Sequence, residues 1–455
     1  MNWPSADEVH RTAKALIDAG KAKDPEEAHQ ILRDLVLQVE VGASVAGDVA
    51  AQAALLTIMN TGHRAFLGGV NVHLESDPIL TVPWAKGLTT HEAITRFGGR
   101  VVTELGSNHP TLAIASPIAQ IGRPILDVGA RDWVAFVGEM PPSGEPGIVP
   151  AGVAAGALGV SEAFQHDLGS VTAGRRDLAV SLWRPDLPWT DSAAHGPALS
   201  YLPSKLWLLG LGHLGQAYAW VLGMLPFATP GDVCIGLMDF DRVIAGNTAT
   251  QLLVRDQDLN RRKTRVVAEA LERLSLQTLI SERAFDRHFQ IDLLRNEPTV
   301  ALAGFDKPEP RLGLGKAGFK RVVDGGIGGG PVEYLDLLIH AFPSNEDPDD
   351  VFRPRSRGGR RLAKPYEEEI ARRVATGENE AAVRCGMLDL AGVTVGAAFV
   401  GAFTGSMVLS DILRHLNGGL EFSVIGVDLR NPCDVRAVQN RAPGPFPGID
   451  FTTPA

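Results

Sequence analysis

The chain has 455 residues, 43 Lys and Arg against 53 Asp and Glu, and a formal net charge of −10. With 45% hydrophobic residues it can bury a sizeable core, which excludes wholesale disorder. The acidic balance argues against a general nucleic-acid or membrane-surface binder, because such proteins present a basic face. Three cysteines and a start without a signal-peptide pattern indicate a reducing compartment, so we expect a cytoplasmic protein.

The first predicted elements form a helical lead-in over residues 1–35. After it, short β-rich apolar runs alternate with Ala- and Leu-rich helical stretches. This alternation is typical of strands joined by crossover helices in a parallel sheet. The sequence therefore predicts an α/β fold.

The alternating pattern occurs twice. The run EVGASVAGDVAAQAAL, residues 40–55, parallels LLGLGHLGQAYAWVLG, residues 208–223. Three further pairs follow in the same order: 109–115 with 297–303, 123–129 with 320–326, and 149–169 with 390–418. We therefore predict two Rossmann-like units in tandem, a pseudo-dimer within one chain. The predicted parts are a first unit over 36–185, a Pro-rich linker over 186–200, a second unit over 201–440 and a tail over 441–455.

Two features distinguish the second unit. It is longer between Asp324 and Ala391, which predicts a charged, partly helical crossover insertion over 345–388. The most apolar run of the chain follows, from Ala391 to Leu413, but glycines interrupt it and it ends in Ser410 and Asp411. We interpret this run as a buried helix and not as a membrane span.

A glycine-rich turn follows a strand-like run of the second unit. Gly210, Gly212 and Gly215 come directly after KLWLLG and before a predicted helix. Glycines allow close backbone approach, and the helix N-terminus offers free N–H groups to a phosphate. The turn alone fits a nicotinamide or flavin site equally well, or a purely structural turn.

The residues after the next strand favour another interpretation. A dinucleotide dehydrogenase usually has one acidic residue about 20 positions after the glycines. Here Asp239 and Asp241 end the strand, and Asn247, Gln251 and Lys263 follow, with Lys263 sixteen residues after Asn247. This pattern counts against an NAD(P)-dependent oxidoreductase, which we keep as an alternative.

A later strand, VALAGFD, ends in Asp306, and Arg311 follows five residues on. With the turn and the spaced Asn and Lys, this pattern resembles the ThiF/MoeB and ubiquitin-activating enzyme superfamily. The resemblance covers about residues 200–420, and more faintly 35–170.

The resemblance implies an enzyme that uses ATP and Mg²⁺ to adenylate the C-terminal carboxylate of a ubiquitin-like protein. It implies that Asp239 or Asp241 binds the ribose, that Lys263 neutralises the triphosphate, and that Asp306 binds the metal. Arg311 and Lys263 are its catalytic candidates in this unit. The implied nucleotide-binding set is Gly210, Gly212, Gly215, Asp239, Asp241, Asn247, Gln251 and Lys263.

One residue departs from the family pattern. Thr250 stands where the family has an arginine, so a guanidinium must come from elsewhere. Arg261 or Arg262 beside Lys263, or Arg33 from the first unit, are candidates. Without such a substitute the chain would be a scaffold with reduced or absent activity, which is the second alternative.

The first unit lacks the whole set of chemical residues. Asn71 and His73 stand near the positions of Asp239 and Asp241, and nothing acidic corresponds to Asp306. We therefore interpret it as the inactive partner of an inactive/active pair. The resemblance also implies a bacterial chain that serves modifier conjugation, including antiviral defence, or sulfur transfer.

The nucleophile candidate is Cys385. It lies at the end of the insertion, before the Gly-rich helix, where the superfamily commonly places its thioester cysteine, and Arg384 would favour the thiolate. Cys433 is the alternative nucleophile, and Cys234 is predicted to lie in the core. A thioester on Cys385 implies a conjugating-enzyme partner that accepts the modifier.

Overall fold

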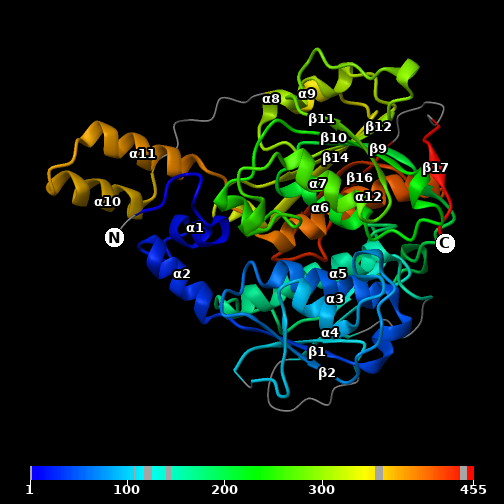
Figure 1. Cartoon of the computed structure of the whole chain (residues 1–455), viewed down its shortest axis with the longest axis horizontal. Helices are drawn as coiled ribbons and strands as arrows, with labels where there is room; N and C mark the ends of the chain where they lie inside the picture. Colours follow the sequence, from blue (N-terminus) through cyan, green and yellow to red (C-terminus); the bar gives the residue numbers. More distant parts are fainter. Residues whose placement is uncertain (1–2, 107, 117–124, 140–144, 354–361, 441–447) are drawn as a thin grey trace.

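In the computed structural model two α/β units pack against each other, with a helical arm at one side (Figure 1). The structure describes residues 3–106, 108–116, 125–139, 145–353, 362–440 and 448–455. The lead-in forms α1 (Arg11–Asp18) and α2 (Pro25–Asp34). Asp24 caps α2 by accepting from the backbone N–H of Glu27 at 2.8 Å.

The first unit is a seven-stranded sheet with the order β3-β2-β1-β4-β5-β6-β7. The neighbours from β3 to β5 are parallel, and β6 and β7 are antiparallel to their neighbours. Its strands are β1 (Leu37–Val41), β2 (Val70–Leu74), β3 (Arg100–Val101), β4 (Thr111–Ile114), β5 (Ile125–Arg131), β6 (Val134–Val137) and β7 (Leu178–Ser181). Its helices are α3 (Val49–Gly62), α4 (Thr90–Arg96) and α5 (Val149–Asp167).

The second unit repeats this strand order and adds one strand at the edge: β11-β10-β9-β12-β13-β14-β15-β16. Its strands are β9 (Lys205–Leu209), β10 (Cys234–Met238), β11 (Gln277–Ser281), β12 (Val300–Ala303), β13 (Arg321–Ile327), β14 (Asp336–Phe342), β15 (Phe422–Asp428) and β16 (Arg436–Gln439). Its helices include α6 (His213–Leu222), α7 (Lys263–Glu272), α8 (Pro308–Arg311) and α12 (Ala398–Leu416). The predicted α/β fold with two tandem Rossmann-like units is therefore confirmed.

Helix α12 lies at the centre of the molecule, packed against α6 of its own unit and against α5 and α3 of the first. The prediction of a buried helix is thus confirmed, although α12 begins at Ala398 and not at Ala391. The preceding helix ends at Gly392, and residues 393–397 form a loop.

Tryptophans also join the two units. The indole rings of Trp84 and Trp220 stack with centroids 5.4 Å apart. Each ring N–H donates across the interface, from Trp84 to the Trp220 carbonyl and from Trp220 to the hydroxyl of Thr57. The units therefore share one apolar core.

The insertion forms α9 (Pro348–Val351), α10 (Lys364–Ala375) and α11 (Glu380–Gly392), while residues 354–361 lie outside the described part. Helices α10 and α11 make a hairpin that projects from the body as the arm (Figure 1). The arm is attached to the lead-in, because the Tyr366 hydroxyl donates to Asp18 and Lys14 donates to the Ala391 carbonyl.

In the described part of the tail, β17 (Phe451–Thr452) pairs with β8 (Leu202–Pro203) at the start of the second unit. Residues 441–447 lie outside the described part. Across all the residues that the structure describes, no helix is both long and apolar enough to cross a membrane.

Candidate functional site

A cavity of about 1140 Å³ opens where β9, β10 and β12 end beside the N-terminus of α6. Ligands of doubly wound sheets bind at this edge. The cavity brings together nine of the residues that the sequence singled out: Gly210, Gly212, Asp239, Asp241, Asn247, Gln251, Lys263, Asp306 and Arg311. Gly215 and Cys385 are not among its lining residues.

Each glycine of the turn has its own role. Gly210 has φ +80°, a conformation that L side chains rarely adopt. A Cβ on Gly215 would lie 1.9 Å from the Gly210 carbonyl oxygen, so this glycine lets the helix pack on the turn. Gly212 is the N-cap of α6, and a Cβ there would meet nothing within 4 Å. No side chain caps α6, so no side-chain oxygen accepts from its first N–H groups, which lie beside the cavity.

Asp239 holds the glycine turn through hydrogen bonds to its backbone. This buried carboxylate accepts from the N–H of Leu211 at 2.6 Å and from the N–H of Asp241 at 2.7 Å. Burial raises the pKa of Asp239, and nearby Lys263 opposes that rise. Asp239 is therefore already occupied in fixing the backbone.

Asp241 is the more available of the two acids. Its side chain is 49% exposed and accepts from the Nζ of Lys263 at 2.8 Å. The Lys263 side chain is only 9% exposed, and its backbone N–H donates to the Asp241 carbonyl. The lysine is thus held at the cavity wall with a defined direction.

Asn247 and Gln251 fix the segment that follows. Asn247 accepts from the N–H of Ile244 at 3.1 Å. Gln251 accepts from Gln216 at 2.8 Å, and Gln216 in turn donates to the Leu211 carbonyl of the glycine turn. These bonds tie the segment to the turn.

Arg11 is the cavity residue that sequence reasoning missed. It opens α1, and α1 is joined to the site because Gly246 donates to the Asp7 carbonyl at 2.7 Å and Thr12 donates to the Gly396 carbonyl at 3.0 Å. One guanidinium nitrogen of Arg11 is buried without a hydrogen-bond partner. Burial lowers the pKa of Arg11, and the carboxylates of Asp7 and Asp306 oppose that.

The three arginines proposed as substitutes for the family arginine lie elsewhere. Arg33 pairs with Glu26, Arg261 pairs with Asp258 and Glu269, and Arg262 donates to the Phe240 carbonyl. None of them lines the cavity. Thr250 does line it, and so do the guanidinium groups of Arg11, Arg283 and Arg311.

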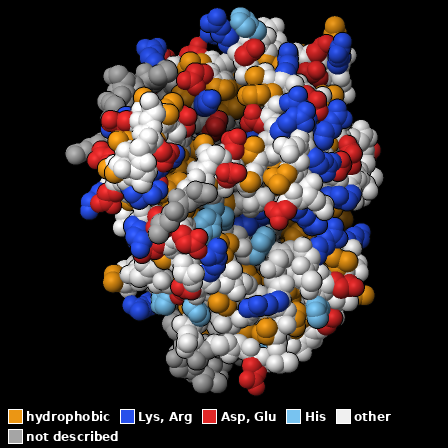
Figure 2. All heavy atoms as spheres, turned by 60° about the vertical axis from the view of Figure 1, so that its left-hand side comes forward, with side chains coloured by type: hydrophobic (Ala, Val, Ile, Leu, Met, Phe, Trp, Pro, Cys, Tyr) orange, Lys and Arg blue, Asp and Glu red, His pale blue; other side chains and the backbone are white. Residues whose placement is uncertain are grey.

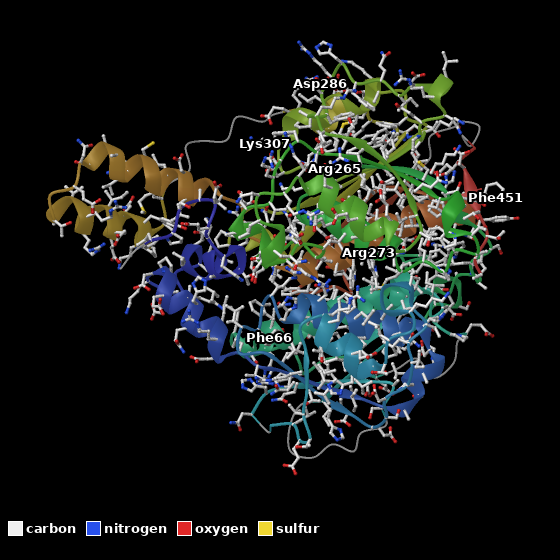
Figure 3. All side chains as sticks on the ribbon, in the orientation of Figure 1. Phe66, Arg265, Arg273, Asp286, Lys307 and Phe451 are labelled. Carbon is white, nitrogen blue, oxygen red and sulfur yellow. The ribbon has the colours of Figure 1, made fainter. Side chains whose placement is uncertain are left out.

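Asp306 and Arg311 occupy the far wall of the cavity. Asp306 is exposed after β12, beside Lys307, which Figure 3 labels on the side of the second unit that faces α1. Arg311 is held by Asp324 at 2.9 Å and by the Phe305 carbonyl at 2.7 Å. Arg311 is therefore a fixed wall residue.

The described residues contain no cluster of three His, Cys, Asp or Glu side chains that could hold a metal ion. Mg²⁺ does not require one, because it is usually held by one or two carboxylates together with substrate phosphates and water. Asp306, exposed and within the electrostatic reach of Arg11, fits that role.

The cysteines are separated from this cavity. Cys385 is exposed in the middle of α11 and not in a loop or at a helix N-terminus, and Arg384 beside it pairs with Glu380 at 3.5 Å. A helix N-terminus therefore does not favour the thiolate of Cys385, and Arg384 is already paired with Glu380. Cys433 is exposed, and Cys234 is partly buried at the start of β10.

In the first unit, the residues that follow β2 are not the ones that the sequence analysis placed opposite Asp239 and Asp241. Leu74 pairs with Val41 at the end of β2 as Met238 pairs with Leu209, so Glu75, and not Asn71 or His73, corresponds to Asp239. Its carboxylate accepts from the N–H of Ala43 at 2.9 Å, as Asp239 accepts from Leu211. The position that corresponds to Asp306 falls among residues 117–124, outside the described part.

Known proteins match both units. The family model of the BilD N-terminal domain matches residues 36–182, and that of the BilD C-terminal domain matches residues 202–419. The bacterial E1-like protein BilD of Collimonas sp. (strain OK412) is 34% identical over 435 residues, which cover 92% of this chain and 90% of the relative. The chain belongs to the BilD family. This places it among bacterial E1-like proteins.

Solved structures resemble this fold only distantly. The complex of E. coli MccB with MccA-N7isoASN has a TM-score of 0.33 and 13% identity, and the match covers 54% of this chain and 66% of that chain. PaaA has a TM-score of 0.33 and 14% identity, and the match covers 55% and 64%. The site assignments for this BilD-family chain therefore rest on its own geometry.

Proposed function

We propose that the second unit adenylates the C-terminal carboxylate of a ubiquitin-like protein. The observation that carries this proposal is the uncapped N-terminus of α6, which faces the same cavity as two cations, Lys263 and Arg11, and two exposed carboxylates, Asp241 and Asp306. Phosphates bind at such helix ends, and the two cations offset their charge.

In the proposed reaction a carboxylate oxygen of the partner attacks the α-phosphorus of ATP. The bond from the α-phosphorus to the bridging oxygen breaks, pyrophosphate leaves with the electron pair, and an acyl-adenylate forms. Lys263 and Arg11 stabilise the charge that develops on the phosphate oxygens, and Asp241 accepts from the ribose hydroxyls. Asp306 would hold Mg²⁺, which neutralises triphosphate charge when bound.

Apolar side chains and the crossover loop complete the cavity. Phe285 and Phe305 line it with stacked rings 5.5 Å apart. Residues 394–396 of the loop before α12 form another part of the wall. An extended peptide end that enters along this loop would lie between the second unit and α1, which is how we propose that the partner's C-terminus reaches the nucleotide.

A second step transfers the acyl group to Cys385. Its thiolate would attack the acyl carbonyl, AMP would leave, and a thioester would remain for a conjugating enzyme. Cys385 lies on the exposed arm and not on the cavity wall, so this transfer requires that α11 move toward the cavity. The transfer test is a thiol-sensitive adduct that Cys385→Ser abolishes and Cys433→Ser leaves intact.

Pyrophosphate exchange into ATP tests the first step. With a suitable ubiquitin-like protein, the wild-type chain exchanges label, and Lys263→Ala or Asp306→Ala lowers the rate by about 100-fold or more. Lys364→Ala and Asp434→Ala are matched controls, because both side chains are exposed and neither lines the cavity. If the two cavity variants exchange label at the wild-type rate, the assignment is wrong.

A further inference from the structure

A second cavity, of about 760 Å³, lies between the two units. The ends of α3 and α4 line it from the first unit, and the end of α7 and residues 252–256 line it from the second. Figure 3 shows Arg273, which follows α7, at this junction. Its volume is that of a small-ligand site.

The lining of this cavity is strongly basic. Five lining residues are lysine or arginine, and Asp256 is the one lining acid. They are Arg64, Arg96, Arg255, Arg273 and Lys86. Within the described ranges none of the five forms an ion pair, although the whole chain carries a net charge of −10.

Arg64 is the buried member of this basic cluster. It donates to the carbonyls of Asn60, Leu252 and Val254, and to the carbonyl of Thr248. Burial lowers its pKa to about 10, so it stays charged at neutral pH, and its hydrogen-bond acceptors are carbonyl and amide oxygens. Neutral acceptors solvate a buried guanidinium without neutralising it, and the carboxylate of Asp256 is the lining acid that opposes the fall in the pKa of Arg64.

The other arginines surround this charge at the rim. Arg96, Arg255 and Arg273 are exposed, and burial together with Arg255 and Arg273 lowers the pKa of Arg96. Like charges gathered in one concave site repel one another, which costs free energy unless an anion binds. The two histidines of the lining, His10 and His63, do not add charge at neutral pH, since burial lowers their pKa to about 3 and about 4.

We propose that this cavity binds a small polyphosphate anion, at a site distinct from the nucleotide cavity of the second unit. Guanidinium groups match phosphate oxygens in pairs, and four of them at one concave site favour a ligand with several phosphates over a single carboxylate. The cavity size favours a small molecule over a folded acidic partner.

The site is coupled to the nucleotide cavity through a shared wall. His10 lines one cavity and Arg11 the other. Likewise Thr248, whose carbonyl accepts from Arg64, is next to Asn247 of the nucleotide site. An anion on the basic cluster therefore acts on the segment that positions Arg11 and Asn247.

Calorimetric titration of the full chain with tripolyphosphate tests this inference. We expect Lys263→Ala, whose nucleotide cavity is impaired, to keep the tripolyphosphate site of the basic cavity with its wild-type affinity. The double variant Arg96→Ala/Arg273→Ala should weaken binding by at least tenfold, because it removes two rim cations. The control Arg295→Ala/Arg436→Ala removes two exposed arginines that line neither cavity and should leave the affinity unchanged.

Three results would overturn the inference. They are no binding to the wild-type chain, equal weakening by the control pair, and loss of binding in Lys263→Ala alone, which would assign the anion to the nucleotide cavity. A hexaglutamate peptide that binds as tightly, with the same dependence on Arg96 and Arg273, would reassign the site to an acidic protein segment. If Lys263→Ala still binds ADP, the natural ligand of the basic cavity is a nucleotide. If it binds tripolyphosphate but not ADP, the natural ligand is an inorganic polyphosphate. None of these outcomes depends on adenylation activity.

Discussion

The two units differ in whether a side chain caps the N-terminus of the helix that follows the first strand. In the first unit Asp48 caps α3, and its carboxylate accepts from the N–H of Ala51 at 2.9 Å. In the second unit Gly212 caps α6 without a side chain. The helix N-terminus that would bind a phosphate is thus already satisfied by an anion in one unit and open in the other.

This difference shows that a binding site can be closed without changing the fold around it. The strand order is the same, and both units use a carboxylate, Glu75 or Asp239, to hold the turn after the first strand. The first unit inserts a short 3-10 turn, Ala43–Gly47, before its helix, whereas α6 follows the glycine turn directly. The strand order is therefore the same in both units, while the N-terminus of the helix is capped by a carboxylate in the first unit alone.

The largest expected effect is on ATP affinity, and it comes from giving α6 a carboxylate cap like that of α3. Gly212→Asp should place a carboxylate on the N-terminus of α6 and reduce ATP affinity by roughly 1000-fold, about 4 kcal/mol. The fold should persist, because a side chain at Gly212 starts in open space. Titration with a fluorescent ATP analogue measures the affinity, and unchanged binding would contradict the phosphate site.

The next effect sharpens the comparison at the first helical residue. This residue is the exposed Val49 in α3 and the partly buried His213 in α6. Burial lowers the pKa of His213 to about 4. Between pH 6.5 and 4 the unfolded chain therefore binds a proton that the folded chain does not, and folding stability falls as the pH falls, by up to about 3 kcal/mol.

Urea denaturation at pH 7 and pH 4.5 measures this loss. His213→Gln, which does not titrate, should make the pH dependence shallower, while His91→Gln at an exposed position should not. The same slope in all three chains would show that His213 is not the titrating group.

Arg11→Ala gives a smaller loss, because Lys263 remains. We expect pyrophosphate exchange to fall about 30-fold, or about 2 kcal/mol, since a cation near the developing phosphate charge is removed. Arg11→Lys should recover part of the rate. Arg33→Ala is the control on the neighbouring helix, and an equal loss there would show that the lead-in acts only through stability.

The smallest expected effect concerns the N-terminus of α3, which Asp48 caps. Asp48→Ala should lower the free energy of unfolding by about 1 kcal/mol through loss of the cap and leave nucleotide affinity unchanged. Chemical denaturation and the same ATP titration provide the two measurements. A change in affinity would mean that the first unit contributes to nucleotide binding.

Local sequence predicted the parts of the site that follow strands directly. Asp239, Asp241 and Asp306 could be placed because strand ends of a parallel sheet meet at one edge. Arg11 could not, since more than two hundred residues separate it from Asn247, and tertiary hydrogen bonds such as that from Gly246 to Asp7 bring them together. A strand ending misjudged by four residues also led to Asn71 in place of Glu75 at the position of Asp239.

The insertion was predicted by length comparison, but its shape was not. Charge and length do not reveal that α10 and α11 form a hairpin, or that Tyr366 attaches it to α1. For this reason the sequence located Cys385 near the crossover but not on an exposed helix face.

The burial of α12 has a consequence for how such a chain evolves. Its side chains are enclosed by α3 and α5 of the unit whose phosphate-binding helix end is closed. Deleting that unit would expose a large apolar surface and leave Trp220 without its stacking partner. The first unit therefore covers apolar surface of the second, which is a reason for selection to retain it that does not depend on what its own helix end binds.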